Sequence, residues 1–343
     1  MKCLILVFLF LVSSAFCEPI VYIVNPGVDL DSANSGRSYH KMRAGIERMG
    51  YKPFWINKPG RLKNSEIFLF HNFWRGSSAL KDYPKEKLVL FMWEPPTVMP
   101  NMYRKDLLAC FNRIYTWDDS LVDNEKFFKL YYPQANLKVA FHVPFEQKKF
   151  AVMVNCNKDS SHSCSLYGER KKIICFFENN YPRDFDLYGR GWSFAEYRSY
   201  RGVVDSKLAC IKNYKFCFAY ENMKNVQGYV TEKIFDAFKA GCVPVYWGAE
   251  NITDYVPKNC FIDRRDFATD EELYRYLKTM EEQEYTIYLQ NIKIFLQSDQ
   301  ALLFSREFYL HTIFEAIMPG YDKDKILTEQ QLNVVQRALS VFN

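Results

Sequence analysis

Short apolar segments alternate with helix-like segments along most of this chain, and this alternation limits its possible folds more than any other feature. In the first part, strand-like segments occur at 20–24, 54–56, 67–70, 88–93 and 113–117, with a helical pattern at 38–49. A second series of strands occurs at 150–155, 185–188, 215–220 and 243–247, with helical patterns between them at 165–178, 206–212 and 231–240. Apolar strands joined by helices predict an α/β fold with parallel sheets covered on both faces.

The length fits two such halves followed by further helices. A chain of 343 residues is longer than the roughly 150 residues of one typical domain. A linker is expected near 142–149, and helical patterns follow at 270–280, 284–297, 301–317 and 328–342. The predicted organisation is a signal peptide at 1–17, two Rossmann-like domains facing a cleft at 18–145 and 146–300, and C-terminal helices at 301–343.

The N-terminus has the pattern of a segment that directs a protein into the secretory pathway. Lys2 precedes the apolar run 4–12, and Ala15 and Cys17 place small side chains before Glu18. This pattern predicts a cleavable signal peptide, and hence a location in the ER or Golgi lumen or outside the cell, or in the periplasm or cell envelope of a bacterium. The run is shorter than the roughly 20 apolar residues of a membrane span, but a short uncleaved anchor, and with it membrane association, stays open.

Charge and motif content argue against several functional classes. The net charge of +5 is spread along the chain without the basic block typical of nucleic-acid binding, so no nucleic-acid partner is expected. Neither a GxGxxG motif nor a P-loop occurs, so dinucleotide oxidoreductases and P-loop kinases lack their signatures here. No CxxC or histidine-rich spacing indicates a zinc site. The pairing of the eight cysteines that follow Cys17 cannot be deduced from their spacing.

The segment 229–248 is expected to form a loop, a helix ended by Gly241 and a strand. Thr231 is the expected N-cap, because its hydroxyl can accept a backbone N–H of the first turn. Glu232 suits the helix dipole there, whereas Lys233 opposes it. A locally unfavourable residue often marks function, and a lysine beside free N–H groups predicts an anion site that suits a diphosphate. An exposed lysine that is simply tolerated is the alternative.

Arg170 is a second cationic residue near a helix N-terminus, in the helix predicted at 165–178. A guanidinium group can bind a phosphate through two donors, which a lysine cannot. A solvated helix face is the alternative for Arg170 and the two lysines after it. Two cationic helix starts in the same half of the chain favour phosphate binding.

Glu94 ends the strand predicted at 88–93 and is followed by two prolines. In open α/β sheets, ligands bind beyond the carboxyl ends of strands. Partial burial beside Trp93 would raise the pKa of Glu94 toward that of a useful general base, and a glutamate that simply reaches solvent is the alternative. Asp118 and Asp119 follow another strand, where turn or helix capping is favoured over metal binding.

Four segments between residues 214 and 267 resemble the α1,3/4-fucosyltransferases, glycosyltransferase family 10. They read YKFCFAYEN at 214–222, YVTEK at 229–233, AGCVPVYWG at 240–248 and FIDRRDF at 261–267. Weaker similarity extends to Arg170 and to the segment MWEPP at 92–96. Animal members usually have a longer anchor, a stem and paired C-terminal cysteines. This sequence differs in each respect, which leaves the acceptor and the host open.

The resemblance implies a GT-B architecture, with the acceptor in the first half, GDP-fucose in the second and an inverting single displacement. Glu94 would be the catalytic base that deprotonates the acceptor hydroxyl. Arg170 and Lys233 would neutralise the departing diphosphate. The phosphate, ribose or fucose groups of the donor would be held by Asn222, Tyr229 and Glu232. Because fixed cations can replace a metal ion, neither a cofactor nor a metal site is expected.

The expected function is that of an α1,3-fucosyltransferase. It would transfer L-fucose from GDP-fucose to O3 of an N-acetylglucosamine residue in a glycan or glycoprotein. A different linkage or acceptor on the same fold is one alternative. A secreted glycan-binding protein that has lost turnover is the other.

Overall fold

The structure is a computed structural model and describes residues 20–24, 43–44, 46–48, 51–56, 67–73, 75–318 and 320–342. The signal peptide predicted at 1–17 lies outside these residues, as does much of the helix predicted at 38–49. Within the described part of the chain, no helix combines the length and the apolar character needed to cross a bilayer.

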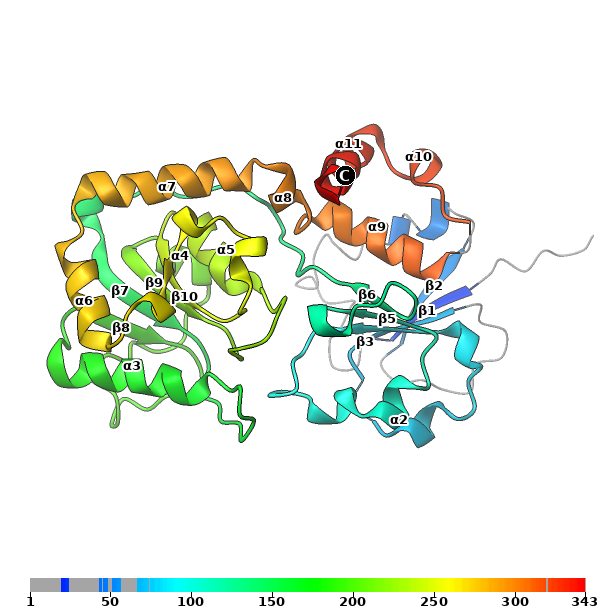
Figure 1. Cartoon of the computed structure of the whole chain (residues 1–343), viewed down its shortest axis with the longest axis horizontal. Helices are drawn as coiled ribbons and strands as arrows, with labels where there is room; N and C mark the ends of the chain where they lie inside the picture. The colour runs from blue at the N-terminus through cyan, green and yellow to red at the C-terminus, as the bar shows by residue number, and fades with distance from the viewer. Residues whose placement is uncertain are drawn as a thin grey trace, which may run out of the picture.

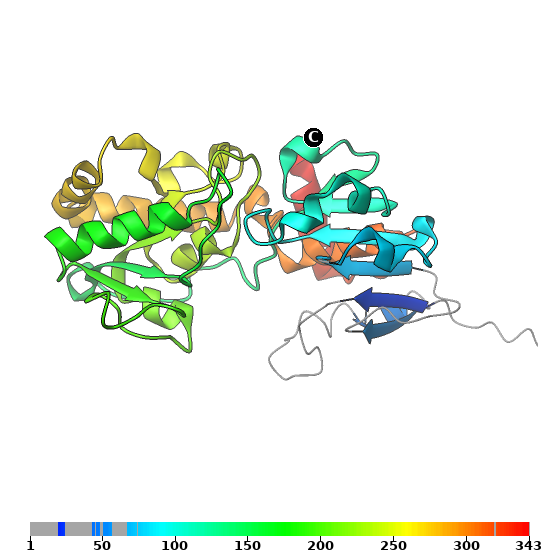
Figure 2. The ribbon, with the colours of Figure 1, turned by 90° about the horizontal axis from the view of Figure 1, so that it is seen from below.

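Two parallel sheets, one in each half of the chain, form the centre of the fold (Figures 1 and 2). The first has six strands in the order β2-β1-β3-β4-β5-β6, and the second has five in the order β11-β10-β9-β7-β8. The strands of the first sheet are β1 (Ile20–Val24), β2 (Lys52–Ile56), β3 (Ile67–His71), β4 (Leu88–Met92), β5 (Arg113–Thr116) and β6 (Phe127–Lys129). Those of the second are β7 (Lys149–Val154), β8 (Phe185–Tyr188), β9 (Tyr214–Tyr220), β10 (Val243–Trp247) and β11 (Ile262–Asp263).

All pairings between these strands are parallel, which confirms the predicted α/β class. The sequence analysis missed β6 and β11, which have only three and two residues and therefore show no clear period. The nine other strands lie where they were expected, with small differences at their ends.

Helices cover both faces of the second sheet, as continuous apolar strands require. Phe218 of β9 packs with Phe177 of α3 (Tyr167–Asn180) on one face, where α6 (Asp270–Thr279) also packs. The preceding residue of β9, Cys217, packs on the opposite face with Ala237 of α5 (Glu232–Lys239). The helix α4 (Lys207–Ile211) also packs on that face. Successive residues of β9 thus point into different cores.

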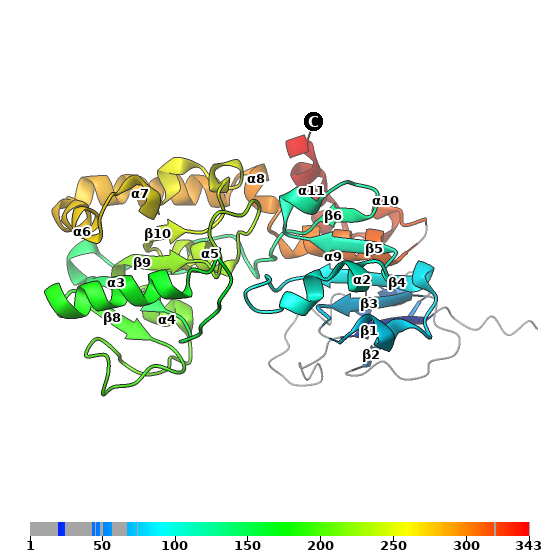
Figure 3. The ribbon, with the colours of Figure 1, turned by 60° about the horizontal axis from the view of Figure 1, so that its bottom comes forward.

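The C-terminal helices return to the first sheet (Figures 1 and 3). After α7 (Glu282–Leu296) and α8 (Asp299–Leu302), α9 (Arg306–Ile317) buries Leu310 and Ile313 against Leu69 of β3 and Val89 of β4. The helices α10 (Lys323–Ile326) and α11 (Glu329–Leu339) follow, and the short α2 (Lys105–Leu108) lies between β4 and β5. The first domain is therefore assembled from both ends of the chain.

Two details of the predicted C-terminal helices differ from the structure. The helix expected at 301–317 is interrupted, because Ser305 acts as the N-cap of α9 and accepts a hydrogen bond from the N–H of Phe308. In α11 the expected capping box of Thr328 and Gln331 is confirmed, and Val335 is buried. The apolar stripe ends before Phe342, which is 61% exposed, because the α-helix stops at Leu339.

Candidate active site at the carboxyl end of β9

A buried carboxylate, Glu221, organises the loop after β9. Its side chain has no exposed surface and accepts hydrogen bonds from the backbone N–H of Thr231 at 2.8 Å and from the hydroxyl of Thr231. Lys233 donates to the same carboxylate at 3.0 Å. A buried charge is tolerated when it is paired and hydrogen-bonded in this way. Glu221 therefore ties the start of α5 to the end of β9.

The position of Thr231 was predicted correctly, but the use of its hydroxyl was not. Thr231 is the N-cap residue of α5, yet its side chain accepts no hydrogen bond from the first turn. The hydroxyl donates to Glu221 and accepts from Lys233 at 3.0 Å instead. No side-chain cap therefore occupies the first-turn N–H groups of α5, which leaves their positive end available to an anion.

Arg170 lies in the first turn of α3 and is buried, with 3% of its surface exposed. Its Nη2 donates to the carbonyl of Tyr220 at 2.7 Å and to the side-chain oxygen of Asn222 at 2.9 Å. Both partners are neutral, and in the described part of the chain no carboxylate forms an ion pair with Arg170. Its buried Nε has no hydrogen-bond partner there either. Because a guanidinium group stays protonated in proteins, Arg170 presents an unneutralised charge at this site.

Tyr229 connects this loop to the first domain. Asn222 donates its side-chain amide to the hydroxyl of Tyr229 at 3.1 Å, and the ring of Tyr229 packs on that of Trp117, with centroids 4.6 Å apart. The preceding Gly228 has φ +80° and lies against the carbonyl of Trp117, where a side chain would not fit. The loop can approach Trp117 this closely because residue 228 is a glycine.

Glu232 is the first residue of α5, and 44% of its side chain is exposed. Its carboxylate lies 3.6 Å from Lys233 and 3.9 Å from Lys207. Burial by itself would raise the pKa of Glu232, but the charges of Lys233 and Lys207 outweigh it and lower the pKa to about 2. Glu232 is thus a permanent anion that still reaches solvent.

Glu94 comes from the first domain, immediately after Trp93 at the end of β4. Its N–H donates to the side chain of Asn72 at 3.0 Å, and its carbonyl accepts from the hydroxyl of Tyr103 at 2.9 Å. Its carboxylate forms no ion pair in the described part of the chain. Burial raises the pKa of Glu94, and the charges of Lys158 and Lys233 partly offset this rise.

The structure brings five of the six predicted site residues, Arg170, Asn222, Tyr229, Glu232 and Lys233, into one connected region. Arg170, Asn222 and Tyr229 form a chain of hydrogen bonds. Lys233 is joined to Glu221, the residue next to Asn222. Glu94 is linked to Lys233 through electrostatic interaction across the two domains rather than through direct contact.

The sequence analysis gave no role to Tyr132, which lies between the two halves of this region. Its hydroxyl donates to the carbonyl of Trp93 at 3.1 Å. Burial, followed by the nearby charges of Glu94 and Glu232, raises the pKa of Tyr132 well above its ordinary value. It is therefore a neutral phenol beside carboxylates of both domains. A tyrosine in the run Tyr131-Tyr132-Pro133 gives no local signal of such a position.

Asp119 was expected to cap a turn or helix, and it makes interdomain contacts instead. It accepts hydrogen bonds from Lys129 at 2.6 Å, from the hydroxyl of Tyr255 at 2.6 Å and from the amide of Asn251 at 3.0 Å. The neighbouring Asp118 does cap a turn, since it accepts from the N–H of Ser120. Among the described residues, no group of three or more histidine, cysteine, aspartate or glutamate side chains is arranged to hold a metal ion.

Comparison with known proteins shows what this region is similar to. Residues 145–301 match the model of glycosyltransferase family 10 (fucosyltransferase), C-terminal part. An α-(1,4)-fucosyltransferase of Arabidopsis thaliana is 40% identical over 86 residues, which are 25% of this chain and 21% of that protein. The mouse 4-galactosyl-N-acetylglucosaminide 3-α-L-fucosyltransferase 9 is 32% identical over 127 residues, 33% of this chain and 34% of that protein. The alignments thus span about a third or less of these relatives.

Solved structures resemble the chain over most of its length. An α1,3-fucosyltransferase crystallised with GDP-fucose aligns with a TM-score of 0.56 over 89% of this chain and 92% of that one, at 17% identity. A glycosyltransferase from Rickettsia africae ESF-5 aligns with a TM-score of 0.56 over 92% and 100%, at 10% identity. At these identities the likeness establishes the GT-B fold that the sequence predicted.

Proposed function

We propose that the protein is an inverting α1,3-fucosyltransferase, because residues 145–301 match the model of glycosyltransferase family 10. It takes L-fucose from GDP-fucose and transfers it to a glycan or glycoprotein, at O3 of an N-acetylglucosamine residue. The name of the mouse relative supports the N-acetylglucosaminide acceptor and the 3-linkage, and the structural neighbour crystallised with GDP-fucose supports the donor. The apolar run 4–12 supports a place in the secretory pathway.

One observation carries the proposal: Arg170 and Lys233 converge on the adjacent residues Asn222 and Glu221, and Glu94 approaches from the other domain. A transferase that displaces a nucleoside diphosphate needs cations on the side of the leaving group. It also needs a base on the side of the acceptor. This arrangement supplies both.

Arg170 is the principal candidate for binding the diphosphate. Its charge has no carboxylate partner within the described residues, and its Nε is buried without an acceptor. Lys233 is already paired with Glu221, so its contribution is smaller. The uncapped first turn of α5 adds backbone donors beside them. Together these fixed donors stabilise the charge of departing GDP without a metal ion.

Three further residues hold the rest of the donor in this proposal. Asn222 and Tyr229 form a hydrogen-bonded pair at the end of β9, and both can present polar groups to a phosphate or ribose. Glu232, which is ionised and solvent-accessible, can accept hydrogen bonds from sugar hydroxyls. Asn222 and Tyr229 lie in the loop between β9 and α5, Glu232 begins α5, and the hydrogen bonds of Glu221 tie the start of α5 to the end of β9.

Glu94 acts as the general base. Its carboxylate accepts the proton of the acceptor hydroxyl, and the oxygen of that hydroxyl forms a bond to C1 of fucose. The bond between C1 and the diphosphate oxygen breaks at the same time, and its electron pair leaves with GDP. Attack opposite the leaving group inverts the configuration at C1. The burial that raises the pKa of Glu94 makes it a better proton acceptor.

The test is GDP release from GDP-fucose with a panel of N-acetylglucosamine-containing acceptors. Arg170→Ala should lower kcat by about 10³-fold and Lys233→Ala by about 10²-fold, within the usual range for removing one donor to a developing charge. Arg183→Ala, which removes an exposed arginine from the same domain, should leave the rate unchanged. Turnover should survive treatment with EDTA.

Glu94→Gln should lower kcat by about 10²–10⁴-fold, as expected for loss of a general base, and Glu86→Gln is its exposed control in the same domain. Product analysis by NMR would define the linkage and the anomeric configuration. Binding of glycans without GDP release under any condition would overturn the proposal. A retained anomeric configuration would refute the single displacement.

A further inference from the structure

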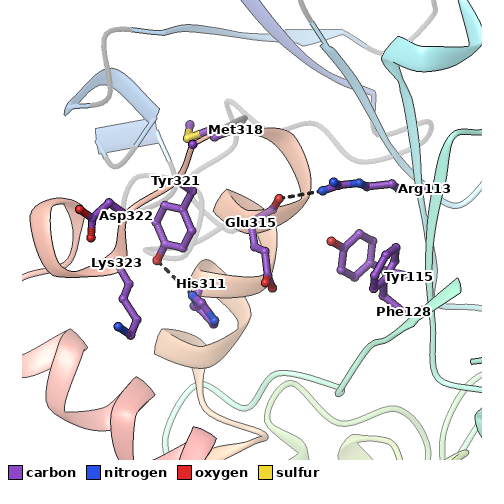
Figure 4. A pocket seen from close by; sticks show the side chains of 10 residues that line it. Arg113, Tyr115, Phe128, His311, Glu315, Met318, Tyr321, Asp322 and Lys323 are labelled. Carbon is purple, nitrogen blue, oxygen red and sulfur yellow. Dashed lines mark hydrogen bonds between the residues drawn. The ribbon is translucent and has the colours of Figure 1, made fainter. Parts of the chain in front are cut away.

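A polar hollow lies in the first domain, between its sheet and the helix that covers it (Figure 4). Its volume is about 530 Å³, within the range of roughly 300–1,000 Å³ that small-molecule sites occupy. Two strands and the end of α9 form its walls. The side chains that matter are those of Arg113, Tyr115, Phe128, His311, Glu315 and Tyr321.

The hollow is separate from the candidate active site. Arg113 is the first residue of β5, whereas the other end of this strand leads to Trp117 and through it to Tyr229. The helix α9 begins beside the second domain, where Phe308 shares an apolar cluster with Phe235 of α5, and runs away from it (Figure 1). Glu315 lies near the far end of that helix. The two sites are thus at opposite ends of the first sheet.

Hydrogen-bonding groups of both kinds face this hollow. Arg113 donates to the backbone carbonyl of Glu315 at 3.2 Å, and the carboxylate of Glu315 forms no ion pair in the described part of the chain. The Nδ1 of His311 and the hydroxyl of Tyr321 share a hydrogen bond at 3.1 Å. Burial, and then the charge of Lys323, lower the pKa of His311 to about 4, so its ring is neutral at physiological pH. Carboxylate, guanidinium, imidazole and phenol groups therefore line one small space.

Aromatic rings complete the walls. Phe128 stacks on Tyr115 with centroids 5.2 Å apart and an interplanar angle of 25°, and the guanidinium of Arg113 lies over Phe128. The ring of Tyr321 packs against His311 and Phe314. Phe128 and Tyr321 are half-buried and line the hollow. Such rings offer flat apolar surfaces that suit the C–H face of a pyranose ring.

The charges around the hollow balance. Arg113 and Lys323 contribute two positive charges, and Glu315 and Asp322 contribute two negative charges. A phosphate or a polyanion would be repelled by the two carboxylates as much as it is attracted by the two cations. A neutral ligand with many hydroxyl groups can use donors and acceptors together. It can also pack on the rings.

We propose that this hollow is a second carbohydrate-binding site, for a neutral mono- or disaccharide unit. The site binds sugar independently of the transfer reaction at Glu94. If the proposed function holds, it would retain one part of a branched glycan while another part receives fucose. Glu315 and Arg113 would bind sugar hydroxyls from two sides, and Tyr321 would contribute both a ring face and a hydroxyl.

NMR titration of the full chain, labelled at tyrosine, with N-acetyllactosamine tests this proposal. The resonances of Tyr321 and Tyr115, assigned with Tyr→Phe variants, should shift in a saturable way. Glu315→Gln and Tyr321→Phe should each raise the Kd for the sugar at this site at least tenfold. For Glu315→Gln the Kd is measured from the resonances of Tyr115 and Tyr321, and for Tyr321→Phe from that of Tyr115. Glu125→Gln, a charge-matched change at an exposed glutamate of the same domain, should leave the Kd unchanged. The conservative Tyr321→Phe variant guards against loss of fold.

The Lys233→Ala variant separates this proposal from the proposed function. Its Tyr321 resonance should still shift with sugar even though transfer is lost. The site would be disproved if neither resonance shifted at roughly 20 mM sugar, well above a weak dissociation constant of about 1 mM. It would equally be disproved if inorganic sulfate, and not sugar, shifted these resonances. A Kd that Glu315→Gln left unaltered would have the same consequence.

Discussion

The carboxyl ends of β9 and β4 present the two halves of the candidate active site, and they are built differently. After β9, Glu221, Thr231 and Lys233 satisfy one another through buried side chains. After β4, Glu94 is positioned only through its backbone, by Asn72 and Tyr103, and its carboxylate forms no ion pair in the described part of the chain. The β9 side is thus held together by its own side chains, whereas the carboxylate of Glu94 keeps its bonding capacity.

The largest loss of stability is expected on the β9 side, when the buried carboxylate of Glu221 is removed. Glu221→Ala removes the buried carboxylate partner of Lys233 and takes the acceptor from Thr231, so the free energy of unfolding should fall by about 3–5 kcal/mol. Denaturant titration measures the change, and Glu250→Ala, at an exposed glutamate of the same domain, is the control. A loss below about 1 kcal/mol, as ordinary surface changes give, would mean that this network does not organise the site.

The β4 side should reveal itself in the pH dependence of activity. A base must be ionised, so kcat/KM should fall about tenfold per pH unit below the pKa of Glu94, which burial raises. Glu232, with a pKa of about 2, stays ionised over this range and contributes nothing to the fall. The prediction is measured as a pH–rate profile of fucosyl transfer.

Lys158 sharpens this test, because its positive charge lowers the pKa of Glu94. Lys158→Ala should therefore move the acid limb of the profile to higher pH. Lys172→Ala, which removes another exposed lysine of the same domain, should not move it. If the acid limb of the pH–rate profile of Lys158→Ala stayed in place or moved to lower pH, the general base would be a residue other than Glu94.

The two sides are joined by Asp119, and weakening this contact should have an intermediate effect. Asp119→Asn leaves Lys129 without its charge partner, and the free energy of unfolding should fall by about 2 kcal/mol. Because Gly228 packs against Asp119, Tyr229 should also be held less firmly and the Kd for GDP-fucose should rise. A double-mutant cycle with Tyr255→Phe measures the coupling. Additive effects would show that the contact does not act as one unit.

The smallest effect is expected far from both strand ends, at Phe342 just after α11, and Val335 within α11 is its buried counterpart. Val335→Ala creates a cavity in the core of the first domain and should lower the free energy of unfolding by about 2 kcal/mol. Phe342→Ala should change it by less than about 0.5 kcal/mol, since that ring is mostly exposed. Equal losses for both variants, measured by thermal unfolding, would show that the predicted stripe docks along its whole length.

The sequence predicted much of this molecule where local rules apply. Nine strands, most of the described helices and the Thr328 capping box were visible, because period, caps and glycine stops act within a few residues. Candidate site residues could be predicted where a cationic residue lies at the start of a helix or a carboxylate follows the end of a strand. Tyr132 and Asn72 were missed, since each acts on residues about 20 or more positions away.

The amino-acid sequence alone predicted two parallel sheets and the likeness of the second half to glycosyltransferase family 10, and it singled out candidate site residues at strand ends and helix starts. Only the tertiary structure decided that Thr231 turns its hydroxyl to Glu221, that Asp119 joins the domains and that α9 covers the first sheet. The physical reason is distance along the chain. Propensities and caps are local, whereas the partner of a buried polar group or apolar face depends on which distant segment packs against it.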